Sequence, residues 1–86
     1  MTNEVVLSGT IKKSFDMTEN VVLATIECNK EYFYIYWLNN EFDLDKIDGC
    51  YAIIKGNLTN LLVKNYNGTP KKITAVCVKG MEKYDF

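Results

Sequence analysis

Histidine and arginine are both absent from this 86-residue chain, so all ten of its cationic side chains are lysines. The three cysteines (Cys28, Cys50 and Cys77) are odd in number and widely spaced, and no two of them form a Cys-x-x-Cys pair. These absences argue strongly against a structural zinc site, which needs clustered cysteine and histidine ligands. The missing arginine also excludes bidentate reading of guanine, although lysine can still neutralise phosphate as a point charge.

No long hydrophobic run is present either. The apolar stretches are short and interrupted by lysine or asparagine, whereas a membrane span needs about 18 apolar residues in a row. The opening residues MTNEVVLSG carry no basic region and no long apolar stretch, so we expect no signal peptide and no membrane partner. Because the cysteines are unpaired, we expect them to be reduced core residues of a cytoplasmic protein.

The residue types that carry most enzyme chemistry are missing or isolated. No cysteine has a base beside it in the sequence, and no glycine-rich phosphate-binding loop is present. Four acids cluster at Glu41, Asp43, Asp45 and Asp48, but a calcium loop needs a longer spaced series that ends in glutamate. We therefore predict a protein that is not an enzyme and that holds no cofactor or metal.

What the chain does contain is alternation of apolar and polar residues, interrupted by turn residues. Its length suits one domain, and we assign all 86 residues to it. The period-two pattern predicts five strands, at residues 4–14, 21–28, 31–38, 50–66 and 71–83. A two-residue hairpin turn is predicted at Asn29-Lys30, and Asn67-Gly68 is the strongest short hairpin signal in the chain.

The predicted strands 4–14 and 50–66 contain the internal glycines Gly9 and Gly56. A glycine inside a strand indicates a sharp bend or bulge, as barrels need at their corners. Residues 39–49 are expected to form a short helix or an acidic loop, with Phe42 and Ile47 facing inward. This order predicts an all-β fold, a five-stranded Greek-key oligonucleotide-binding barrel with a short helix or loop between strands three and four. A five-stranded barrel of the SH3-like type is the alternative.

Several segments resemble the bacterial single-stranded DNA-binding protein family, and together they cover nearly the whole chain. The matching segments are NEVVLSG (3–9), VVLATIECN (21–29), the aromatic run 31–38, GCYAIIKGNL (49–58) and YNGTPKKITAVCVKGMEK (66–83). The primosomal DNA-binding relative of that family is also similar, at VVLSGT. The chain departs from the family in its shorter helix segment, its lack of arginine and its lack of a long tail.

The resemblance implies stacking of bases on aromatic residues of the third strand. It also implies a homodimer or homotetramer assembled through the first strand. Full-length family members end in an acidic tip that finishes in phenylalanine and recruits partner proteins. Tyr84-Asp85-Phe86 at the end of this chain is a weak match to that tip.

Residues 31–38, EYFYIYWL, contain five of the 11 aromatic residues of the chain. Because a strand points successive side chains to opposite faces, one face carries Tyr32, Tyr34 and Tyr36 and the other carries Phe33, Ile35 and Trp37. We expect the second set in the core and the tyrosines outside, where they would form a stacking surface for bases. Two alternatives remain: the tyrosines only pair across the sheet, or a one-residue slip makes Trp37 and Phe33 the platform.

Charge divides unevenly along the chain. Residues 16–48 carry a net charge of −6 and residues 50–86 a net charge of +4. In this fold the loops after strands one and four flank the aromatic face, so five lysines are candidates for contacting phosphate: Lys12, Lys13, Lys64, Lys71 and Lys72. Tyr66 is a candidate for a further stacking ring. The alternative is an ordinary solvated surface. The acidic residues 41–48 are expected on the opposite side of the barrel or facing a protein partner.

These patterns predict non-sequence-specific binding of single-stranded DNA in support of replication or recombination. The short chain suggests a version from a mobile element, a phage or a compact genome, or an accessory replication protein. RNA remains possible because stacking tolerates either sugar, and replication proteins are possible partners. The alternative is a protein-interaction module or inhibitor that uses the same aromatic face, since tyrosine is enriched at protein interfaces. The salt dependence of binding distinguishes the two hypotheses, because the affinity for DNA falls steeply as the salt concentration rises.

Overall fold

A computed structural model of the chain describes residues 3–14, 16, 18, 21–38 and 41–84. Its elements are β1 (Glu4–Lys13), β2 (Val21–Cys28), β3 (Glu31–Leu38), α1 (Leu44–Ile47), β4 (Tyr51–Lys64) and β5 (Pro70–Tyr84). All five predicted strands form, and the segment predicted as helix or loop contains one short helix. The predicted tip at Asp85-Phe86 lies outside the described residues.

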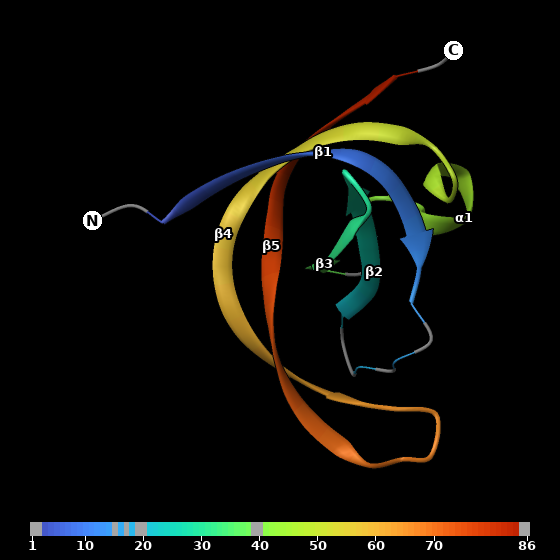
Figure 1. Ribbon diagram of the computed structural model, residues 1–86, viewed down its shortest axis with the longest axis vertical. Helices are drawn as coiled ribbons and strands as arrows, with labels where there is room; N and C mark the ends of the chain where they lie inside the picture. Colours follow the sequence, from blue (N-terminus) through green and yellow to red (C-terminus); the bar gives the residue numbers. More distant parts are fainter. Residues whose placement is uncertain (1–2, 15, 17, 19–20, 39–40, 85–86) are drawn as a thin grey trace.

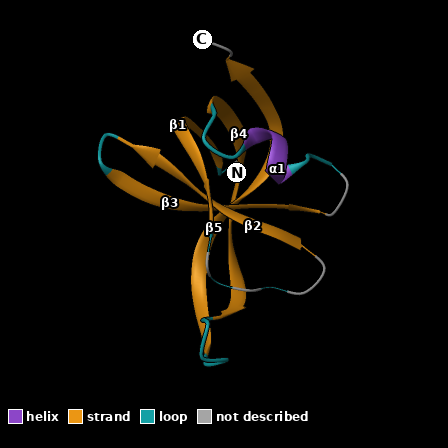
Figure 2. Cartoon of the chain, turned by 90° about the vertical axis from the view of Figure 1, so that its right-hand side faces the viewer, coloured by secondary structure: helices purple, strands orange, loops and turns teal. Residues whose placement is uncertain are grey.

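The strands close into a barrel in the order β1-β2-β3-β5-β4 (Figures 1 and 2). β1 pairs antiparallel with both β2 and β4, β4 pairs antiparallel with β5, and β3 runs parallel to β5. This connectivity is that of the oligonucleotide-binding fold, so the predicted fold class is confirmed and the SH3-like alternative is wrong. The long β4–β5 hairpin extends from the barrel at the bottom of Figure 1.

Glycine allows the two bends that close the barrel. β1 pairs with β4 through residues 4–10 and with β2 through residues 10–13, so the strand changes partners beside Gly9. A side chain at Gly9 would collide with the backbone carbonyl of Glu27, and one at Gly56 with that of Cys77. Gly56 also adjoins the break in β4–β5 register. Both glycines are required because another strand's backbone lies where a Cβ atom would be.

Gly56→Ala is therefore expected to lower the free energy of unfolding by about 1–3 kcal/mol, the usual cost of forcing extra atoms into a packed region. Gly80→Ala in the adjoining strand is the matched control, because its added Cβ would meet no atom within 4 Å. Urea denaturation followed by circular dichroism measures both. Equal stability of the two variants would show that β4 and β5 can separate at Gly56 without cost.

The core is formed by inward-facing residues of all five strands and by Ile47 of α1. Trp37 is fully buried; its indole N–H donates to the Phe42 carbonyl at 3.0 Å, and the two rings meet edge to face at 5.8 Å. Phe42 packs against the core, so the inward placement predicted for Phe42 and Ile47 is confirmed. α1 thereby covers one end of the barrel.

Two expectations about the core need correction. Phe33 was expected inside with Ile35 and Trp37, but it is 37% exposed. It lies near the β2–β3 turn, at the end of the strand pair, and is not part of the buried cluster. The cysteines are free and half-buried rather than fully buried, with only Cys28 packing against the core among them.

None of the described helical segments is long and apolar enough to span a membrane.

Candidate nucleic-acid interface

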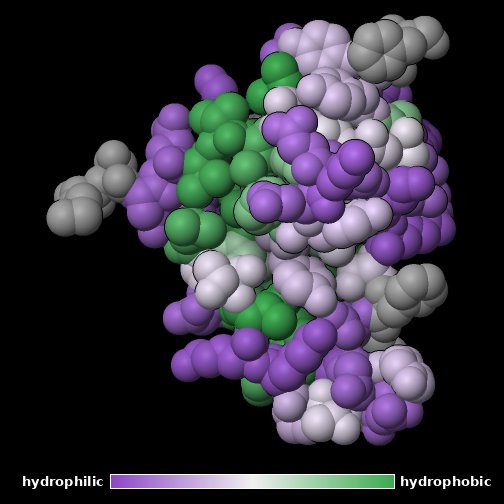
Figure 3. All heavy atoms as spheres, viewed as in Figure 1, coloured by the Kyte–Doolittle hydropathy of each residue, from purple (hydrophilic) through white to green (hydrophobic). Residues whose placement is uncertain are grey.

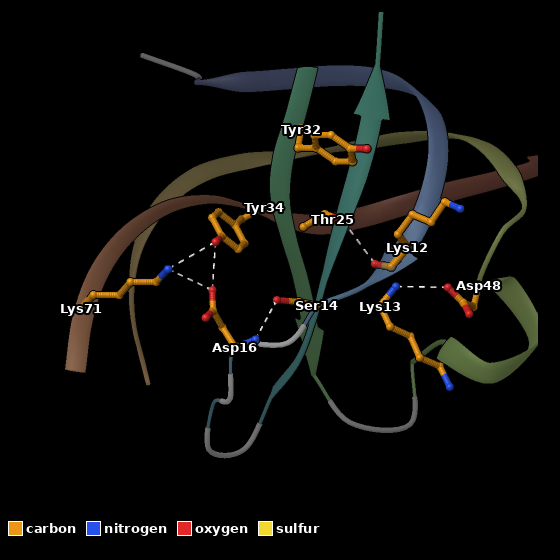
Figure 4. A pocket seen from close by; sticks show the side chains of 9 residues that line it. All are labelled: Lys12, Lys13, Ser14, Asp16, Thr25, Tyr32, Tyr34, Asp48 and Lys71. Carbon is orange, nitrogen blue, oxygen red and sulfur yellow. Dashed lines mark hydrogen bonds and ion pairs between the residues drawn. The ribbon is translucent and has the colours of Figure 1, made fainter. Parts of the chain in front are cut away.

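A hollow of about 620 Å³ opens beside the outer surface of β2 and β3. Its walls come from four parts of the chain: the end of β1 with the residues that follow it, the β2–β3 pair, the residue after α1, and the start of β5 (Figure 4). The lining residues are Lys12, Lys13, Ser14, Asp16, Thr25, Tyr32, Tyr34, Asp48 and Lys71. Five of these are predicted site residues, so the fold brings half of the predicted set to one place.

The strand register decides which aromatic face is exposed. Ile35 and Trp37 are fully buried, whereas Tyr32 is 64% exposed and Tyr34 lines the hollow. Tyr34 pairs with Thr25 of β2, whose side chain stands beside it in the wall of the hollow. The tyrosines are therefore outside, as expected. Trp37 must be removed from the candidate stacking residues, because its ring is enclosed in the core and offers no face to a base.

The three tyrosines differ in what their hydroxyl groups contact. Tyr32 lines the hollow and is 64% exposed, while the Tyr34 hydroxyl donates to Asp16 Oδ2 at 2.8 Å (Figure 4). The Tyr36 hydroxyl lies 3.0 Å from Thr59 Oγ1 of β4, and burial is the main cause that raises the pKa of this phenol. Tyr36 does not line the hollow. Along this face of β3, the ring of Tyr32 is thus exposed and that of Tyr36 is half-buried.

Lys12 and Lys13 line one side of the hollow, as predicted. The Lys13 ammonium lies 2.7 Å from Asp45 Oδ1, and its backbone N–H donates to Asp48 Oδ1 at 3.1 Å. The hydrogen bond to Asp45 is the main cause that raises the pKa of Lys13. Both groups of this ion pair are well exposed, so solvent screens it and its contribution to stability is small.

The position of the acidic segment differs from the expectation. Of the two placements expected for residues 41–48, the opposite side of the barrel is wrong, because Asp48 lines the hollow and Asp45 contacts Lys13. The cause is backbone pairing after α1, where Gly49 N–H donates to the Ile11 carbonyl and Ile11 N–H to the Cys50 carbonyl. These bonds hold the end of α1 against the end of β1.

Lys71, at the start of β5, lines the opposite side of the hollow. Its ammonium lies 3.1 Å from Asp16 Oδ2 and 3.5 Å from the Tyr34 hydroxyl, and 5.7 Å from the centre of the Tyr34 ring. The hydrogen bond to Asp16 is the main cause that raises the pKa of Lys71. One cation, one ring and one carboxylate therefore meet at this end of the hollow (Figure 4).

The remaining predicted residues of the β4–β5 hairpin do not line the hollow. Lys72 directly follows Lys71 on the same strand, so its side chain points to the opposite face. Lys64 and Tyr66 lie at the exposed end of the hairpin, where the Tyr66 side chain is 80% exposed. These three side chains are exposed, but the structure does not bring them to Tyr32, Tyr34 and Tyr36.

Four lining residues were not predicted: Ser14, Asp16, Thr25 and Asp48. Thr25 could have been found, because the two-residue turn fixes the β2–β3 register and places Thr25 opposite Tyr34. Asp16 lies in a polar segment of the sequence, and no neighbouring residue indicates its partners. One of them, Lys71, lies 55 positions further along the chain. Within the described ranges no group of three or more potential metal-ligating side chains is present.

A second exposed surface is apolar. Val6 on β1 and Leu58 on β4 are 54% and 46% exposed. Figure 3 shows hydrophobic side chains gathered on the side where the first half of β1 crosses β4 in Figure 1. Within the described strands, residues 4–9 of β1 pair with β4 and with no strand on their other side. This half of β1 is therefore an open strand edge, which another chain can extend.

Comparison with known proteins supports the fold. Neither a family model nor a curated protein sequence matches the chain. Two crystal structures of Rim1, the mitochondrial single-stranded DNA-binding protein of S. cerevisiae, are similar, one of them selenomethionine-labelled. The first is 12% identical with a TM-score of 0.66, over 96% of this chain and 94% of that one. The labelled form is 10% identical with the same TM-score, over 96% and 95%. The barrel is thus the oligonucleotide-binding fold of these single-stranded DNA-binding proteins.

Proposed function

We propose that this protein binds single-stranded DNA without sequence specificity. One observation carries the proposal: the exposed ring of Tyr32, the half-buried ring of Tyr34 and lysines of β1 and β5 converge on one hollow. The hollow lies beside the strand pair and between the two loop regions with which this fold binds oligonucleotides. The similarity to Rim1, a single-stranded DNA-binding protein, points to the same ligand.

In the proposed mode of binding, bases stack on Tyr32 and Tyr34. Stacking on an aromatic ring contributes about 1–3 kcal/mol per base and tolerates any base. Lys12, Lys13 and Lys71, on the two sides of the hollow, neutralise backbone phosphates. Because the chain has no arginine, it lacks the side chain that most often reads guanine, which is consistent with binding without sequence specificity.

The wider biological role is part of the same proposal. We assign the chain to the bacterial single-stranded DNA-binding type, acting as a binding protein rather than an enzyme in replication or recombination of a mobile element or phage. RNA is the second candidate ligand, since base stacking tolerates either sugar. Self-association into a dimer or tetramer is supported by the open edge of β1 and the apolar side chains beside it.

A protein-interaction module is the second candidate. Asp16 and Asp48 in the lining favour it, because carboxylates repel phosphate and accept hydrogen bonds from a protein partner. Tyrosine is also enriched at protein interfaces. A tyrosine-centred protein interface would lose much less affinity with salt than a phosphate-binding one.

Fluorescence anisotropy of a labelled oligo-dT of about 30 nucleotides, long enough to cover the roughly 4–16 nucleotides that one such barrel occupies, tests the proposal. We expect saturable binding at low salt and a logarithmic affinity that falls linearly with the logarithm of salt, by about 0.7 for each phosphate neutralised. Failure to bind at tens of micromolar protein in low salt would reject DNA binding and direct the search to a protein partner.

A further inference from the structure

Asp16 contacts two groups at one end of the hollow, the Tyr34 hydroxyl and the Lys71 ammonium. A bound nucleic acid would use both of these residues. Asp16 Oδ2 accepts from the Tyr34 hydroxyl at 2.8 Å and lies 3.1 Å from the Lys71 ammonium. The Asp16 side chain is only 13% exposed, whereas the Lys71 side chain is 42% exposed. The carboxylate is thus enclosed by its partners while the cation still faces solvent.

The same contacts fix where Lys71 lies relative to the stacking ring. Its ammonium is 5.7 Å from the centre of the Tyr34 ring, within the range of a cation–π contact. A phosphate that approaches Lys71 meets an ammonium already paired with a carboxylate. A base that approaches Tyr34 meets a ring whose hydroxyl is fixed and beside which a cation is already placed.

From these contacts we propose that Asp16 is an intramolecular competitor of the nucleic-acid backbone for Lys71, and that it lowers and tunes the affinity of the hollow. The inference rests on the proposed function and adds a residue that sets its strength. When DNA binds, a phosphate oxygen replaces Asp16 Oδ2 on the ammonium, so one ion pair is exchanged for another. Lys71 then releases few counterions and contributes little to the salt dependence of binding.

The other ion pair in this region does not have the same properties. Lys13 and Asp45 are both well exposed, with side-chain exposures of 54% and 81%, and Asp45 does not line the hollow. Solvent and salt screen such a pair, so Asp45 competes with phosphate only weakly. Asp16 differs because it is enclosed and also holds the stacking tyrosine.

Asp16→Asn is the decisive variant, because asparagine keeps the shape and an oxygen that accepts from Tyr34 but removes the charge. In the oligo-dT titration we expect it to bind about threefold to tenfold more tightly at low salt. The plot of log affinity against log salt should become steeper by about 0.7, the value for one more phosphate neutralised on a single strand. Glu82→Gln is the control: it changes the net charge equally, but Glu82 is exposed near the far end of β5 from Lys71.

Two further variants test the competition directly. Tyr34→Phe keeps the stacking ring but removes one of the two bonds to Asp16, so it should bind as tightly as the wild type or up to threefold more tightly. Lys71→Ala should weaken binding by less than about twofold in the wild-type chain but by about fivefold in the Asp16→Asn chain, where the cation is free to bind phosphate. Thermal melts of each variant establish that it is folded.

The outcomes separate the inference from the proposed function. If the wild type binds and Asp16→Asn matches Glu82→Gln in both affinity and salt slope, the competition is refuted while DNA binding stands. If folded Asp16→Asn binds more weakly than the wild type, Asp16 supports the site rather than competing for it, and the inference is overturned. If neither the wild type nor any variant binds the strand, the proposed function itself fails.

Discussion

Tyr32→Ala is expected to weaken binding of single-stranded DNA by about 5- to 150-fold, the equivalent of about 1–3 kcal/mol for one lost stacking contact. The expectation follows from the position of the ring, which is 64% exposed and lines the same hollow as Lys12 and Lys13. Because the ring is on the surface, its removal should leave the barrel intact. Anisotropy titration of labelled oligo-dT, at one fixed low salt concentration, gives the ratio of dissociation constants.

The chain contains a matched control for this experiment. Tyr66 is 80% exposed but lies at the end of the β4–β5 hairpin, outside the lining of the hollow. Tyr66→Ala should therefore change the affinity by less than about twofold, as is usual for a surface substitution away from the contacts. A large loss in Tyr66→Ala together with none in Tyr32→Ala would move the binding surface from the hollow to the hairpin.

Trp37→Ala is expected to lower the free energy of unfolding by about 3–5 kcal/mol, which is a large part of the total stability of a domain of this size. The ring is fully buried, packs against Phe42 and donates a hydrogen bond to its carbonyl. The substitution leaves a cavity in the core and removes the donor for that carbonyl. Urea denaturation followed by circular dichroism measures the loss.

Trp37→Phe separates the structural role of this residue from a role in binding. Phenylalanine fills most of the space, so the variant should fold with a smaller loss of stability and bind oligo-dT as tightly as the wild type. If it is folded but has lost binding, the aromatic face that touches DNA would be that of Trp37, contrary to the register of β3. The same titration thus checks which face of the strand is used.

Much of the fold could be predicted from the sequence because the signals were local. Alternation of apolar and polar residues marked all five strands, and the turn at Asn29-Lys30, where both residues adopt positive φ, fixed the β2–β3 hairpin. Gly9 and Gly56 marked the bends, since only glycine lets another backbone pass so close. Phe33 was misplaced because alternation gives the face of a strand but not where the core ends.

The candidate site was only half predictable, since its charge pattern depends on residues that are distant in the sequence. Exposed tyrosines and nearby lysines followed from strand parity and from the loops that flank this fold. The pairing of Lys71 with Asp16, and the placement of Asp48 in the lining, required the closed barrel. Composition and periodicity divide the side chains of a strand between its two faces. Ion pairs across a barrel depend on which loops closure brings together, and only the tertiary structure decides that.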